Sequence, residues 1–266
     1  MLAINPRRVV YIRITAPTPD PASSLFLSGT QLTNIDQLQK LTSNERGESR
    51  ALARARGILP TAPTVMRGLV QRLVLAPDAK PNRILTFISA RSGEGTSTVA
   101  QDFVAALATE TQQKILLLDA GQLYAERFMA HGIDPTLGMV DALALNMQHT
   151  QAVHPVGGGV FMARWVGRAE NHSLAGKLAR DASFWQSMRT LFNTIVIDAP
   201  SLESSFDGVA FAARADAAVL VVEAESTRRQ VVERLRDTLR DAGARLIGIV
   251  MNKRRFYIPD EIYRRL

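Results

Sequence analysis

Short apolar runs without polar alternation are the feature that most constrains the fold of this chain of 266 residues. Runs of this kind, bounded by turn residues, are typical of strands that are buried on both faces of a sheet. The runs are ILTFIS (84–89), KILLLDA (114–120), TIVIDAP (194–200), AAVLVVEA (217–224) and RLIGIVMN (245–252). VFMARW (160–165), which follows the turn PVGGG, is expected to be another strand.

Helical patterns lie between these runs. Apolar residues recur at helical spacing over 96–109, 174–190 and 227–242, and Gly243 is a natural stop for the last of these helices. Strands that alternate with helices form a parallel sheet with right-handed crossovers. We therefore predict an α/β fold, with a mainly parallel central sheet and helices on both faces.

The N-terminal part of the chain has a different pattern. VVYIRI (9–14) has the composition of one strand, and TAPTPDPASS (15–24) has the proline and small polar residues of a linker. TVMRGLVQRLVLA (64–76) is expected to be an amphipathic helix that leads into the folded core. The sequence thus predicts a partly irregular, partly disordered extension over 1–63 and one domain over 64–266.

SARSGEGTST (89–98) lies between the first predicted strand of that domain and a predicted helix, which is the place of a phosphate-binding loop. Gly93 and Gly95 allow backbone N–H groups to close on phosphates, and the helix adds the positive end of its dipole. The hydroxyl of Ser97 stands where such loops bind Mg²⁺. We expect the nucleotide to contact Ser92, Gly93, Glu94, Gly95, Thr96, Ser97 and Thr98.

The loop departs from the pattern G-x-x-x-x-G-K-[ST] at two positions. Ala90 replaces the first glycine, and Thr96 replaces the lysine. That lysine bridges the β- and γ-phosphates, and loss of one such preorganised charge slows transfer by about 10²-fold or more. A tight turn that binds no ligand remains the alternative interpretation.

Two predicted strands end in aspartate, at Asp119 and Asp198. Ligands of open parallel sheets bind beyond the carboxyl ends of the strands, so both carboxylates are expected near the loop. Carboxylates are ligands that Mg²⁺ accepts directly or through water, and we expect Ser97, Asp119 and Asp198 to form a magnesium site.

The net charge of +7 is unevenly distributed. Residues 1–83 carry a balance of +7, residues 84–252 of −3, and residues 253–266 of +3. Basic flanks favour an anionic membrane surface or an acidic partner, although a solvated surface explains them equally well. The basic segments are not interleaved with aromatic residues and contain no known nucleic-acid-binding motif, so we do not expect nucleic acid as a partner.

The compartment is indicated by two features of the composition. The chain has no cysteine, and no apolar stretch approaches the roughly 20 residues that span a bilayer, so we expect a cytoplasmic protein.

The chain resembles the cytoplasmic P-loop domains of the bacterial tyrosine kinases of capsule and exopolysaccharide synthesis, which share a broad group with the cell-division and partition ATPases. The resemblance runs from about Thr64 to the C-terminus. The motifs that carry it are SARSGEGTSTVAQDF, KILLLDAG, TIVIDAP, ADAAVLVVEAESTRR and GIVMNKRRFYIPDEIYRRL.

The resemblance implies that the chain binds ATP or ADP with Mg²⁺ and that Asn252 contacts adenine. Without it, Asn252 reads as a turn residue. Arg91 stands where the ATPases of the group carry a second lysine, which reaches a nucleotide across a dimer interface. We count Arg91 with Asp119 and Asp198 as candidate catalytic residues, although a solvent-facing Arg91 is the simpler interpretation.

The chain also departs from this family in ways that weaken catalysis. Thr96 replaces the lysine, Asp119 is followed by Ala120 and Gly121 rather than a second acid, and the tail holds only Tyr257 and Tyr263. We therefore expect a catalytically weak or inactive nucleotide-binding regulator of a membrane polysaccharide copolymerase or chain-length regulator, peripheral at the inner face of the membrane and able to form homo-oligomers. The alternatives are an active tyrosine autokinase or ATPase, and a positioning ATPase of the cell-division and partition type.

Overall fold

The structure, a computed structural model, describes residues 11–14, 64–74, 83–121, 128–129 and 132–253. Its strands are β1 (Tyr11–Ile14), β2 (Arg83–Ser89), β3 (Ile115–Asp119), β4 (Val153–Gly157), β5 (Val160–Arg164), β6 (Thr194–Asp198), β7 (Ala217–Glu223) and β8 (Leu246–Asn252). Its helices are α3 (Thr64–Leu73), α4 (Thr96–Glu110), α6 (Met139–Ala144), α7 (His172–Ala179), α8 (Ala182–Leu191), α9 (Asp207–Arg214) and α10 (Arg229–Asp241), with short 3-10 turns η1 (His149–Ala152) and η2 (Ala169–Asn171).

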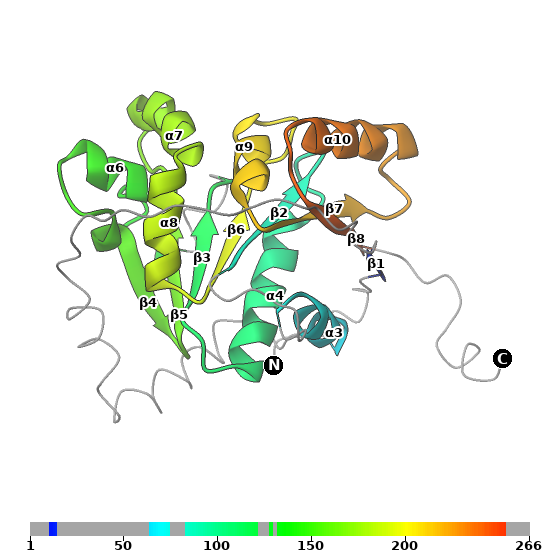
Figure 1. Cartoon of the computed structure of the whole chain (residues 1–266), viewed down its shortest axis with the longest axis horizontal. Coiled ribbons are helices and arrows are strands. Elements are labelled where there is room, and N and C mark those ends of the chain that lie inside the picture. Colours follow the sequence, from blue (N-terminus) through cyan, green and yellow to red (C-terminus); the bar gives the residue numbers. More distant parts are fainter. Residues whose placement is uncertain (1–10, 15–63, 75–82, 122–127, 130–131, 254–266) are drawn as a thin grey trace, which may run out of the picture.

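The strands form one sheet in the order β1-β8-β7-β2-β6-β3-β5-β4 (Figure 1). The inner six are parallel, whereas β1 and β4 pair antiparallel with β8 and β5 at the two edges. The predicted α/β class and mainly parallel sheet are therefore confirmed. β1 comes from the segment expected to be an extension, but the predicted division at residue 63 stays a prediction, because 15–63 lies outside the described residues.

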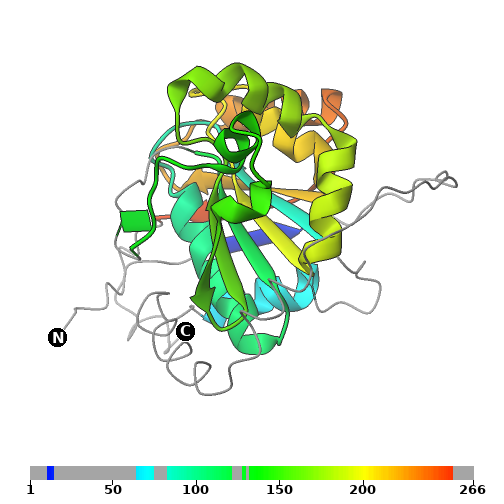
Figure 2. The ribbon, with the colours of Figure 1, turned by 90° about the vertical axis from the view of Figure 1, so that its left-hand side faces the viewer.

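Helices cover both faces of the sheet, as Figures 1 and 2 show. Alternate residues of each inner strand point to opposite faces: on β2, Ile84 and Ile88 join one buried cluster, whereas Leu85 and Phe87 join the other. The first cluster packs under α6, α7, α8, α9 and α10, and the second under α3 and α4. Burial on both faces explains why the strands read as continuous apolar runs.

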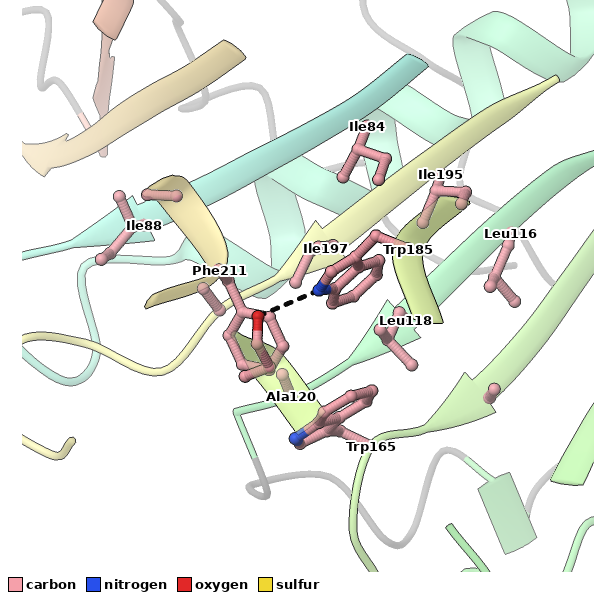
Figure 3. Packing of buried hydrophobic residues seen from close by; sticks show 14 of the residues in the cluster. Ile84, Ile88, Leu116, Leu118, Ala120, Trp165, Trp185, Ile195, Ile197 and Phe211 are labelled. Carbon is pink, nitrogen blue, oxygen red and sulfur yellow. Dashed lines mark hydrogen bonds between the residues drawn. The ribbon is translucent and has the colours of Figure 1, made fainter. Parts of the chain in front are cut away.

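The segment 174–190, predicted as one helix, is two helices. The first ends at Ala179 with Arg180 as its C-cap, and Asp181 caps the second, because its carboxylate accepts a hydrogen bond of 2.8 Å from the backbone N–H of Ser183. The indole Nε1 of Trp185 donates to the carbonyl of Ala179 at 2.9 Å and closes the junction (Figure 3). The single-helix prediction was wrong because helical spacing of apolar residues continues across the break.

The turn predicted at PVGGG is shorter than expected. Pro155, Val156 and Gly157 belong to strand β4, and only Gly158 and Gly159 make the turn to β5. Both turn glycines have positive φ, 61° and 75°, as a two-residue hairpin requires. The six strands predicted at the apolar runs are confirmed, as is the helix at 96–109.

Candidate nucleotide-binding site

The segment between β2 and α4 has the local geometry of a phosphate loop. Gly93 and Gly95 have φ values of 85° and 94°, which glycine adopts at little cost. Gly95 is the residue before the first turn of α4, no side chain caps that end of the helix, and its first turn contains no acidic residue. The N-terminal N–H groups of a 15-residue helix are thus left for an anion.

Glu94 fixes the shape of this loop from inside. Its side chain is 2% exposed, and one carboxylate oxygen accepts 2.9 Å hydrogen bonds from the backbone N–H groups of both Ala90 and Arg91. The other oxygen accepts from the hydroxyl of Thr227. The carboxylate of Glu94 therefore holds the loop together rather than facing a ligand.

A pocket of about 240 Å³ opens at the loop. It is lined by Ser89, Ser92, Gly93, Gly95, Thr96, Ser97, Thr98, Gly121, Asp198, Ala199, Pro200, Ser201, Ser204 and Lys253. Most of the predicted phosphate-contact residues thus meet in one hollow with Asp198. Arg91, Glu94, Asp119 and Asn252 do not line it.

Asp119 and Asp198 stand side by side at the carboxyl edge of the sheet, because β3 and β6 are parallel neighbours that pair these two residues in register. Their exposed fractions are 8% and 5%. Asp119 accepts a 3.1 Å hydrogen bond from the N–H of Gly121, which turns the chain at the end of β3. In-register neighbours point to the same face, so the two carboxylates and the nearby Ser97 hydroxyl are a donor set that suits Mg²⁺.

Asn252 is almost fully buried, at 1% exposure, and braces the loop. Its Nδ2 donates to the carbonyl of Glu94 at 3.0 Å, and a Cβ added to Gly95 would collide with the same nitrogen. The adenine contact expected of Asn252 stays a prediction. Arg91 is exposed, and its role as a second cation also stays a prediction.

The fold brings to this pocket three further residues that were not predicted from the sequence. Ser201 and Ser204, from the segment after β6, contact each other at 2.7 Å and contact the Ser92 hydroxyl at 3.2 and 2.8 Å. Lys253, directly after β8, donates from Nζ to the carbonyl of Gly93 at 2.6 Å. The signal for all three was their position just beyond the end of a predicted strand.

Arg164 is another missed residue. Arg164 is the last residue of β5 and pairs in register with Asp119 on β3. The buried Arg164 therefore lies at the same carboxyl edge of the sheet as Asp119 and Asp198. Its Nη1 donates to the carbonyl of Pro135 at 2.7 Å. VFMARW was predicted only as a strand, and no role was expected for the residue that ends it.

Comparison with known proteins points to one group. The tyrosine-protein kinase CpsD of Streptococcus agalactiae is 28% identical over 180 residues, which cover 65% of this chain and 76% of CpsD. The protein EpsB of Ralstonia solanacearum is 28% identical over 83% of this chain and 29% of its own length. The succinoglycan biosynthesis transport protein ExoP of Rhizobium meliloti is 26% identical over 65% of this chain and 22% of its own length. No protein-family model matches the chain.

Solved structures agree. The kinase domain of the Escherichia coli tyrosine kinase ETK matches with a TM-score of 0.56 at 20% identity, over 63% of this chain and 66% of that one. The homologues of this chain are bacterial tyrosine kinases. The septum site-determining protein MinD of Pyrococcus horikoshii, complexed with Mg-ADP, matches with a TM-score of 0.51 at 22% identity, over 63% of this chain and 68% of that one. At these identities the structures show a shared P-loop NTPase fold for this kinase-like chain.

Proposed function

We propose that this chain is a nucleotide-binding, catalytically weak relative of the bacterial tyrosine kinases, which regulates a membrane polysaccharide copolymerase in exopolysaccharide or capsule synthesis. The observation that carries the nucleotide part is the pocket in which the loop glycines, Ser97 and Asp198 meet. In this proposal Ser97, Asp198 and Asp119 hold Mg²⁺, which neutralises phosphate charge when bound.

The side chains in the pocket support weak catalysis. Thr96 lies where the lysine of a phosphate loop belongs, is 8% exposed and lines the pocket. A hydroxyl donates a hydrogen bond but brings no positive charge to the β- and γ-phosphates. Gly121, at the place of the second acid of the family, also lines the pocket and adds no carboxylate.

The proposed membrane partner is supported by the relatives of this chain and by the positive charge of its flanks. ExoP is named as a biosynthesis transport protein, and the family that this chain resembles works beside membrane polysaccharide copolymerases. Among the described residues, no helix combines the length and the apolar character that crossing a bilayer requires. We propose that the chain lies in the cytoplasm against the inner face of the membrane, where its basic flanks favour anionic lipid.

Restoring the missing charge tests whether catalysis is weak for the reason given. Thr96→Lys should raise the rate of ATP hydrolysis or of phosphate incorporation by about 10-fold or more, because the ammonium stabilises charge as the bond breaks. Thr190→Lys is the matched control, since it places the same charge at an exposed position of α8 that does not line the pocket, and it should leave the rate unchanged. The proposal is contradicted if the natural chain already turns over ATP as fast as Thr96→Lys, with loss of turnover in Asp198→Ala. That result would favour an active autokinase, whose candidate acceptors Tyr257 and Tyr263 lie outside the described residues.

A further inference from the structure

We propose that Lys253 binds the phosphate groups of a ligand in the loop pocket, without taking over the part that a lysine at position 96 plays in phosphoryl transfer. The identity of the ligand as a nucleotide rests on the proposed function. The phosphate contact itself does not, and it is tested below with a ligand that has no base or sugar.

The first support is the position of the ammonium group. Lys253 lines the same pocket as Thr96, Ser97 and Asp198, although it is more than 150 residues away from Thr96 and Ser97 in sequence. Its Nζ lies 2.6 Å from the carbonyl oxygen of Gly93, within the loop itself. Among the described residues that line this pocket, it is the only lysine or arginine. By contrast, Arg91 is exposed and does not line it.

The second support is the backbone conformation of Lys253. Its φ is 57°, in the left-handed region that residues other than glycine seldom adopt. Asn252, the residue before it, is fixed on both sides: Nδ2 binds the carbonyl of Glu94 at 3.0 Å, and the Asn252 carbonyl accepts from Ala224 N–H at 2.8 Å. Unfavourable backbone conformations of this kind persist where the surrounding contacts determine them, and they cluster at ligand sites.

The third support is that the present partners of the ammonium are weak enough to yield to a phosphate. Lys253 pairs with Glu223 at 3.3 Å, with side chains 44% and 31% exposed. Exposed pairs of this kind contribute little, and a neutral carbonyl such as that of Gly93 binds an ammonium less strongly than a phosphate does. A polyphosphate at the loop therefore competes well for Nζ.

The test measures the Kd of inorganic tripolyphosphate, without Mg²⁺, for the full chain by calorimetry. Lys253→Gln keeps an N–H donor for the Gly93 carbonyl but loses the charge, so it should weaken binding by about 10-fold or more. Lys253→Arg should stay close to the natural chain. Lys114→Gln is the matched control: Lys114 precedes β3, at the opposite end of this strand from the pocket, and its variant should bind tripolyphosphate with an unchanged Kd. Glu223→Gln should strengthen binding by about two- to fivefold, because it removes the competing anion. Thermal unfolding of each variant confirms that it is folded.

Each outcome decides one claim. Binding that Lys253→Gln loses and Lys253→Arg keeps supports the inference, even if Mg-ATP does not bind, in which case the proposed nucleotide function fails alone. Unchanged binding in Lys253→Gln, or binding lost in Arg91→Gln instead, overturns the inference. If the natural chain binds neither tripolyphosphate nor Mg-ATP, both claims fail.

Discussion

At the scale of single residues, Glu94 shows how a side chain in a ligand motif can serve the fold. The sequence places it among the phosphate contacts, but its buried carboxylate accepts two backbone N–H groups of the loop and the Thr227 hydroxyl. Nothing local in RSGEGTS reveals this, because Thr227 lies in the segment after β7, 133 residues further along the chain. The places of Gly93, Gly95 and Ser97 in the pocket lining were predictable, since they follow from the loop pattern alone.

We expect Glu94→Ala to lower the free energy of unfolding by about 2–4 kcal/mol, because it leaves buried loop N–H groups without an acceptor. Urea denaturation measures the change. Glu170→Ala, an exposed carboxylate on η2, is the control and should change stability by less than about 0.5 kcal/mol. Equal stability of the two variants would show that the Glu94 contacts do not hold the loop.

At the scale of elements, the inner strands and the edge strand β1 were predictable, whereas the edge strand β4 was not. β2, β3, β6 and β7 are buried on both faces, so their apolar runs are unmistakable, and β8 keeps an apolar run although it is only partly buried. The edge strand β4 has mixed burial and contains a proline, and its sequence reads as part of a turn. The helices α6 and α9 are short, 6 and 8 residues, and give too few turns for helical periodicity to stand out.

Two histidines at the β4 edge of the sheet make the free energy of unfolding depend on pH. Burial lowers the pKa of His149, on η1, and of His154, on β4, below the ordinary value of 6.5. The folded chain thus keeps both imidazoles neutral while the unfolded chain protonates them. As pH falls through about 6.5 the unfolded state takes up more protons, so the free energy of unfolding should fall between about pH 7.5 and pH 5.5. The double variant His149→Gln, His154→Gln should show a smaller fall, and an identical fall would contradict the cause given.

At the scale of the whole molecule, the sequence predicts which strands end near the loop but not which side chains line it. Alternating strands and helices fix a parallel sheet, and a parallel sheet brings Asp119, Asp198 and the loop to one edge. Which of these residues face the pocket depends on the crossovers and on the segments that follow each strand. That is why Ser201, Ser204 and Lys253 emerge only from the fold.

The proposed regulatory role predicts that the whole protein binds a membrane partner. The full chain should bind the cytoplasmic part of a membrane polysaccharide copolymerase from its own organism, and Mg-ATP should change the affinity by about fivefold or more, as a coupling of 1 kcal/mol requires. Sedimentation of the mixture with and without nucleotide measures this. No association in either state would contradict the regulatory role and leave the nucleotide site unaffected.

The proposed function requires that the loop still binds a magnesium nucleotide although Thr96 replaces its lysine. Calorimetric titration of Mg-ATP and Mg-ADP into the natural chain, Ser97→Ala and Asp198→Ala tests it most directly. We expect micromolar binding in the natural chain, weakened about 10-fold or more in both variants, because each removes a ligand of the metal. Absence of binding at millimolar nucleotide, or equal binding by all three proteins, would contradict the account.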